Sequence, residues 1–109
     1  MENTQDLINE WKGNAVKLQS EQMQGMMQYH SSVFSDGALD KKTKHLVAIG
    51  TALTAGCNWC VALHVDGALK AGASREQILE ASWAVAFMGG GPALMHMQLV
   101  IKALDDFGA

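Results

Sequence analysis

Apolar side chains in the first 30 residues recur at spacings of three and four positions, which is the period of an amphipathic helix. The positions that follow this period are Leu7, Ile8, Trp11, Ala15, Leu18, Met23, Met26 and Tyr29. The pattern predicts one long first helix. We expect an interruption near Gly25, because glycine is unfavourable inside a helix.

Polar and glycine positions divide the rest of the chain into four further predicted helices. Asp40 is a candidate N-cap for the second helix, which should end near Gly56. A third helix should run from Asn58 to Gly72. The fourth should start at the capping-box motif Ser74-x-x-Gln77, and the glycines at 89–91 separate it from a fifth, whose first turn tolerates Pro92.

Every periodic segment has the helical period, and no alternating run of β-branched residues suggests a sheet. The sequence therefore predicts an all-α protein and disfavours βαβ folds, including the thioredoxin architecture. A length of 109 residues fits one domain over 1–109. A helical chain this small leaves apolar faces that copies of itself often cover, so we expect self-association.

The charge balance excludes some classes of partner. A formal net charge of −3 and a pI of about 5.7 give no positive field for nucleic acid. No apolar run reaches the roughly 20 residues that cross a bilayer, and the N-terminus is polar, so no membrane association and a cytoplasmic location are expected. In a reducing compartment, two cysteines indicate redox chemistry, metal binding or packing rather than a structural disulfide.

The candidate chemistry lies in a CxxC pair followed by a histidine, formed by Cys57, Cys60 and His64. If a helix starts near Asn58, Cys60 lies in its first turn, where unpaired N–H groups and the helix dipole favour a thiolate. His64 stands one turn further on the same face, where it can take the thiol proton or, once protonated, stabilise the thiolate. Cys60 is therefore the better candidate nucleophile.

Cys57 can complete a redox cycle. When Cys60 attacks a peroxide and becomes a sulfenic acid, the thiol of Cys57 can condense with it, release water and leave a disulfide. Closing so short a loop would stabilise the fold by only about 2 kcal/mol on the loop-entropy model, so a purely structural disulfide is the weaker interpretation.

His45 is a further candidate for the same site. In a helical hairpin that turns at Gly56, His45 lies about 18 Å from Cys57 along the first arm, and His64 about 10 Å along the second. This offset predicts a water-bridged contact between the two histidines, through which His45 could pass protons to His64. His30 and His96 are isolated in the sequence, and surface or packing roles are expected for both.

These residues resemble the alkylhydroperoxidase AhpD-like proteins of the carboxymuconolactone decarboxylase superfamily, over about 39–94. The resemblance rests on the Leu-x-x-Lys-x-Lys start of the second helix, the CxxCxxxH cluster, the Gly-Ala-Ser followed by an acidic residue and Ile, and the small-residue stretch that ends Gly-Gly-Pro. It implies a compact multi-helical domain whose hairpin carries the CxxC at the start of its second helix.

The resemblance also implies peroxide reduction at Cys60, with Cys57 as the resolving partner and His64 in the proton relay. It implies assembly as homo-trimers or homo-hexamers, re-reduction by a dithiol donor such as a lipoyl-bearing protein, and no metal or organic cofactor. Two positions depart from the family pattern: His45 stands where glutamate is usual, and Trp59 lies inside the CxxC where many members have histidine.

Other interpretations remain open from the residues alone. Cys57, Cys60, His64 and His45 could form a Cys2His2 zinc site, although their spacing matches no common zinc module. The cysteines could be packing residues, or the protein could be a scaffold without turnover. A general disulfide oxidoreductase or a decarboxylase-like enzyme would suit the same fold, but lactone decarboxylases of the superfamily do not use the cysteine pair.

Overall fold

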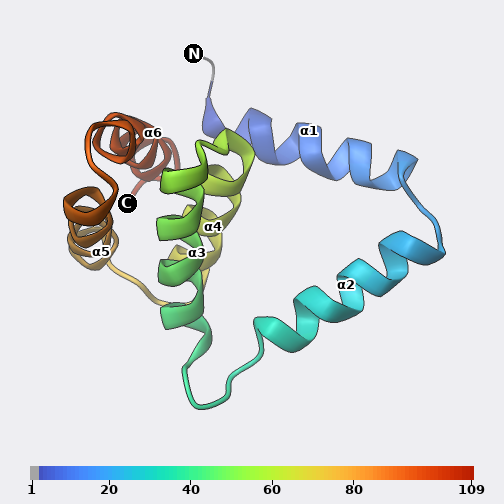
Figure 1. Cartoon of the computed structure of the whole chain (residues 1–109). Coiled ribbons are helices and arrows are strands. Elements are labelled where there is room, and N and C mark those ends of the chain that lie inside the picture. The colour runs from blue at the N-terminus through green and yellow to red at the C-terminus, as the bar shows by residue number, and fades with distance from the viewer. Residues whose placement is uncertain (1–2) are drawn as a thin grey trace.

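A computed structural model describes residues 3–109, and within them the secondary structure consists of helices without strands. In chain order the helices are α1 (Thr4–Lys17), α2 (Glu21–Val33), α3 (Lys41–Ala55), α4 (Asn58–Lys70), α5 (Arg75–Gly89) and α6 (Gly91–Asp106). The predicted all-α class is confirmed. Figure 1 shows α3 and α4 side by side at the centre, with α5 and α6 on one side and α1 and α2 on the other.

The central hairpin forms where the sequence predicts it. Asp40 caps α3 by accepting the backbone N–H of Thr43 at 2.7 Å, and Gly56 ends the helix with a φ of +71°. A left-handed backbone at this position favours glycine, which lets the chain turn at once into α4. Cys57 is the N-cap of α4, so the dithiol motif sits at the hairpin turn.

The second half of the chain follows local signals equally closely. Ser74 and Gln77 form the reciprocal capping box at the start of α5. Gly90, with a φ of +75°, separates α5 from α6, and Pro92 occupies the first turn of α6. These helix boundaries agree with the prediction because each depends on side chains close in sequence.

Apolar side chains from α3 to α6 form one core. Its members are Ile49, Ala52, Leu53, Val61, Val65, Ala68, Ala73, Ile78, Ala86, Met97, Leu99, Val100, Ala103 and Leu104. The start of α1 joins this body through the buried Ile8. The backbone N–H and hydroxyl of Thr4 both donate to Oδ2 of Asp106 at 2.7 Å, which links α1 to the end of α6.

The predicted single first helix is wrong, because the segment folds as α1 and α2. The break lies at Leu18–Ser20, where the side chain of Ser20 accepts the backbone N–H of Met23 and starts a new helix. Gly25 lies inside α2 and does not interrupt it. Apolar periodicity continues across both helices, so the pattern hid a break that a local cap creates.

Helix α2 stands apart from the rest of the protomer (Figure 1). None of its residues is buried, and no Cα atom of α2 lies within 8 Å of a Cα atom of another helix. Its exposed apolar side chains are Met26, Met27, Tyr29 and Val33. Among the described residues, no helix is long and apolar enough to cross a membrane.

Candidate active site

The two cysteines are joined in a disulfide at the N-terminal end of α4, with their Cα atoms 5.2 Å apart. Cys57 is the N-cap. Cys60 lies in the first turn, as the sequence predicts. The backbone N–H of Cys60 donates to Sγ of Cys57 at 3.2 Å. After reduction, this N–H group and the positive end of the helix dipole favour negative charge on sulfur.

His64 lies one turn further along α4 and lines the same cavity as both cysteines. The cavity has a volume of about 280 Å³, and small side chains of α3 form its opposite wall. Its lining residues are Ala48, Thr51, Ala52, Ala55, Cys57, Cys60 and His64. We call it the dithiol cavity. The small residues leave room for a reactant to approach the sulfur atoms.

His45 contacts His64 directly, because their Nδ1 atoms are 3.1 Å apart. The predicted water-bridged contact is therefore wrong. The distances along the two helix axes suggested an offset, but the recess at Gly67 on α4 allows a direct contact. Gly67 has no side chain, so the buried ring of His45 lies against α4 there and reaches His64.

An aromatic stack covers the histidine pair. The ring of Phe34, just after α2, stacks with its centroid 4.7 Å from that of His45 and 5.2 Å from that of His64. The ring of His30, one helical turn before Phe34, lies 4.7 Å from Phe34. Neither Phe34 nor the place of His30 in this stack was predicted from the sequence. The only local signal was their spacing of four residues.

Burial and neighbouring positive charge act on both histidines of the pair. Burial, followed by repulsion from His45 and His30, lowers the pKa of His64 to about 4. Burial also lowers the pKa of His45, as do the charges of Lys41 and His30, against a smaller opposing effect of Asp66. His64 is therefore uncharged at neutral pH, so one of its ring nitrogens is free to accept a proton.

Two neutral imidazoles in this contact must hold complementary tautomers. One ring donates its Nδ1–H, and the other accepts that proton at an unprotonated Nδ1. The Nε2 atom of His64 is the ring nitrogen left for other partners. Because the shared proton can lie on either ring, the contact can transmit a proton from one histidine to the other.

A second cavity is lined by both histidines of the pair. It has a volume of about 340 Å³ and is lined by Trp11, Met27, His30, His45, Leu63 and His64. His64 belongs both to this cavity and to the dithiol cavity. The second cavity is formed partly by α1 and α2, so these helices complete the surroundings of His45 and His64.

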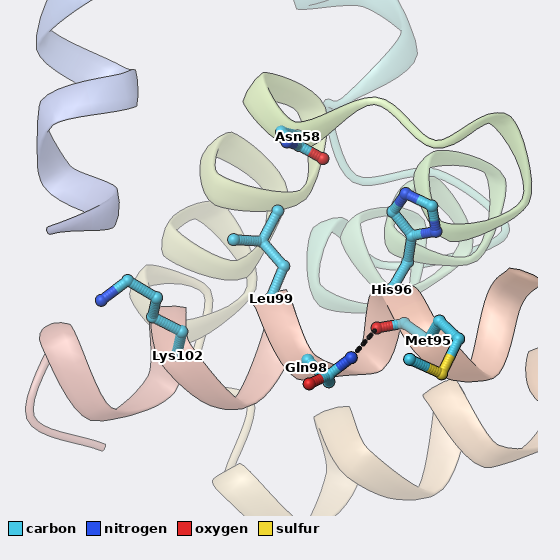
Figure 2. A pocket seen from close by; sticks show the side chains of 6 residues that line it. All are labelled: Asn58, Met95, His96, Gln98, Leu99 and Lys102. Carbon is cyan, nitrogen blue, oxygen red and sulfur yellow. Dashed lines mark hydrogen bonds between the residues drawn. The ribbon is translucent and has the colours of Figure 1, made fainter. Parts of the chain in front are cut away.

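A third cavity, of about 370 Å³, lies beside the hairpin turn but contains neither cysteine. Figure 2 shows His96 and Lys102 reaching from α6, with Leu99 between them and Asn58 above. Nδ1 of His96 lies 2.8 Å from the carbonyl oxygen of Pro92, to which it can donate. His96 thus lies apart from the histidine pair, as the sequence suggested.

Within residues 3–109, no group of three or more His, Cys, Asp or Glu residues is arranged to hold a metal ion. The two cysteines of the Cys2His2 alternative are bonded to each other. The arrangement thus gives no support to that zinc site.

Comparisons with known proteins give a consistent result. The family model described as the carboxymuconolactone decarboxylase family matches residues 21–103. A protein of Paracoccus denitrificans, uncharacterized protein 4 in cox locus, is 47% identical over 74 residues, which cover 68% of this chain and 67% of that protein.

Two solved structures share the fold. The apo form of lpg0406, a carboxymuconolactone decarboxylase family protein of Legionella pneumophila, is 33% identical with a TM-score of 0.84, covering 97% of this chain and 94% of that chain. A family protein of Thermotoga maritima, whose description raises an involvement in the antioxidative response, has a TM-score of 0.84 at 23% identity, covering 94% and 90% of the two chains. Because the family model matches most of this chain, the chain belongs to the carboxymuconolactone decarboxylase family.

Proposed function

We propose that this protein is a thiol-dependent peroxidase of the alkylhydroperoxidase type, in which Cys60 attacks a hydroperoxide and Cys57 resolves the product. The observation that carries the proposal is the shared dithiol cavity of Cys57, Cys60 and His64, together with the contact of His64 with His45. These residues supply a nucleophile, a resolving thiol and a route for the proton.

The oxidative step begins with the reduced pair. His64 accepts the thiol proton of Cys60 at Nε2, because its Nδ1 is occupied by His45. The thiolate attacks one peroxide oxygen, so an S–O bond forms as the O–O bond breaks. The attacked oxygen is the terminal one, which keeps its hydrogen, so Cys60 becomes a sulfenic acid. The leaving alkoxide takes a proton from solvent and departs as an alcohol, which balances the thiol proton that leaves through His64.

The resolving step joins the two cysteines. Sγ of Cys57 attacks the sulfur of the sulfenic acid, and hydroxide leaves with the proton of the Cys57 thiol as water. The N-cap position of Cys57 supports this step, because the N–H of Cys60 stabilises negative charge on its sulfur. The product is the disulfide between Cys57 and Cys60.

His45 extends the proton route beyond His64. When His64 takes a proton at Nε2, it can release its Nδ1 proton to His45, which returns His64 to the neutral form. Protonated His45 then loses a proton from its own Nε2. The lowered pKa values of both rings favour the return of the proton to solvent at neutral pH.

A dithiol donor completes the proposed cycle by thiol–disulfide exchange. One donor thiolate attacks the disulfide to give a mixed disulfide, and the second donor thiol releases it, which oxidises the donor and returns both cysteines to thiols. The small side chains of Ala48 and Ala55 on the cavity wall suit a slender dithiol. A lipoyl-bearing protein presents such a group.

We also propose that the chain assembles as a homo-trimer or homo-hexamer. Within residues 3–109, no Cα atom of α2 lies within 8 Å of a Cα atom of another helix, so the backbone of α2 is not packed against the rest of the protomer. A second exposed apolar surface lies across α5 and the start of α6, where Phe87 and Met88 are 86% and 83% exposed. Large exposed apolar surfaces are typical of association sites, and a further copy would cover them.

The test is a peroxide-consumption assay with dihydrolipoamide or dithiothreitol as the donor. We expect turnover by the native protein and its loss in Cys60→Ser. In Cys57→Ser, one equivalent of peroxide should leave a sulfenic acid that dimedone traps on Cys60. The chain has two cysteines, so the site of labelling is unambiguous.

Other outcomes separate the alternatives. Normal peroxide turnover by Cys60→Ser would exclude the proposed mechanism. Sulfenic acid on Cys57 in Cys60→Ser would reverse the assignment of the two cysteines. If the protein oxidised the dithiol donor with protein disulfides as acceptors but not with peroxides, it would be a general disulfide oxidoreductase.

A further inference from the structure

Gly67 lies on α4, three residues after His64, at the point where the ring of His45 packs against this helix. A Cβ atom at Gly67 would lie 2.7 Å from Nδ1 and 2.9 Å from Nε2 of His45. Real Cβ atoms essentially never approach other atoms so closely. Any side chain at this position would therefore displace the imidazole.

The backbone conformation does not require a glycine at position 67. Its φ is not positive, and it occupies the interior of a regular helix, where glycine is less favourable than alanine. Gly13 in α1 is also inside a helix, but a Cβ atom there would meet nothing within 4 Å. The two glycines therefore differ in what a side chain would contact, and at Gly67 that contact is His45.

The ring of His45 has little freedom to move elsewhere. Its side chain is buried, it stacks on Phe34 with a centroid distance of 4.7 Å, and its Nδ1 lies 3.1 Å from Nδ1 of His64. Displacement by a Cβ atom at Gly67 would have to disturb one of these two contacts. A hydrogen bond weakens steeply with distance and misalignment, so the contact with His64 is sensitive to a small shift.

We propose that Gly67 is a positioning residue whose missing side chain sets the hydrogen bond between His45 and His64. Its part in turnover rests on the proposed function, whereas its effect on the two rings does not. It acts through His45 and contacts no reactant. This assigns a purpose to a glycine that lies outside the CxxCxxxH motif.

The test compares Gly67→Ala with Gly13→Ala and Gly50→Ala. At Gly50 a Cβ atom would lie 2.8 Å from Cγ2 of Val85, so this variant strains the core between α3 and α5 away from the histidines. We expect Gly67→Ala to lower kcat/KM about tenfold, a partial loss of general acid–base catalysis. Gly13→Ala should retain native activity, and Gly50→Ala should lower thermal stability without changing the ring signals of His45 and His64.

Two readouts separate positioning from simple destabilisation. Nitrogen-15 NMR spectra of the imidazoles should lose the signature of the shared Nδ1 proton in Gly67→Ala and keep it in both controls. In the His45→Ala background, adding Gly67→Ala should cost no further kcat/KM, because the ring that the new Cβ atom meets is gone.

The inference is overturned if Gly67→Ala keeps the shared-proton signature, or if it lowers kcat/KM equally with and without His45. If the native protein shows no peroxidase activity, the proposed function fails. The NMR comparison of Gly67→Ala with its controls then still decides whether Gly67 positions His45.

Discussion

The Nδ1 atoms of His45 and His64 lie 3.1 Å apart, so one proton joins two imidazole rings beside the cysteine pair. Burial and the mutual repulsion of the rings both disfavour a charged His64. A carboxylate at position 45 would have the opposite effect, because it would favour the charged form of its neighbour. After burial, the residue at position 45 is thus the main influence on the charge state of His64.

We expect His45→Glu to raise the pKa of His64 by about 1–3 units, the usual effect of an opposite charge at this distance. An NMR titration of the imidazole C2 proton measures this value directly. The acid limb of the kcat/KM profile should move to higher pH by a similar amount. His45→Gln is the matched control, since it has similar size without the charge, and an unchanged pKa in His45→Glu would contradict the electrostatic argument.

The stability of the fold should fall in mildly acidic solution because of the same pair. The pKa of His64 in the folded protein is lowered to about 4, so the unfolded chain binds a proton at a higher pH than the folded chain does. The contribution of His64 to the free energy of unfolding is therefore constant above about pH 7 and decreases as pH falls from about 6.5 towards 4. The lowered pKa of His45 acts in the same direction.

Urea unfolding of the oxidised protein at several pH values tests this linkage. We expect a loss of about 1–2 kcal/mol from His64 over this window, after allowance for the solvent that reaches the ring. Asp40 and Asp106 also have lowered pKa values, but the stability that they contribute is lost only at lower pH. His64→Gln should make the curve between about pH 6.5 and 4 less steep, with the contribution of His45 remaining. His96→Gln, at a histidine outside the pair, should leave the slope unchanged.

Features that depend on residues close in sequence could be predicted, and features that depend on contacts between helices could not. Asp40, Gly56 and Ser74 act within a few residues, and the helices that they bound agree with the sequence. The direct contact of His45 with His64 depends on a recess at Gly67 in the neighbouring helix, which no spacing within one helix reveals. The position of Phe34 depends on the connection between α2 and α3, which has no periodic pattern.

Phe34 should control the environment of both histidines, because its ring stacks on each of them. We expect Phe34→Ala to admit water to the pair and to raise the pKa of His64 towards its ordinary value, since burial is the largest cause of the shift. The free energy of unfolding of the variant should also be about 1–3 kcal/mol lower, a smaller loss than for a fully buried phenylalanine. NMR titration and urea unfolding measure the two effects.

Phe34→Leu is the control for this variant, because it keeps an apolar side chain over the rings without the aromatic stack. It should retain most of the lowered pKa of His64. If Phe34→Ala left the pKa of His64 unchanged, the ring of Phe34 would not be what shields His64 from solvent.

Helix α2 should be an assembly element. Met26 and Tyr29 are 60% and 65% exposed on a helix whose Cα atoms lie more than 8 Å from those of the other described helices. An isolated helix of 13 residues is marginal in water, so its stability requires an apolar partner surface. Assemblies of three or six chains would have masses of about 35 or 70 kDa, against 11.7 kDa for one chain.

Light scattering coupled to size-exclusion chromatography measures this mass. We expect Met26→Glu combined with Tyr29→Glu to shift the protein to a smaller species, because charge is costly in an apolar interface. Gln24→Glu adds charge to the same helix without removing an apolar side chain and should leave the mass unchanged. Because α2 carries Met27 and His30 of the cavity beside His64, the dissociated variant should also lose activity. A native protein that elutes with the mass of one chain would exclude the assembly, and α2 would then need another partner to cover it.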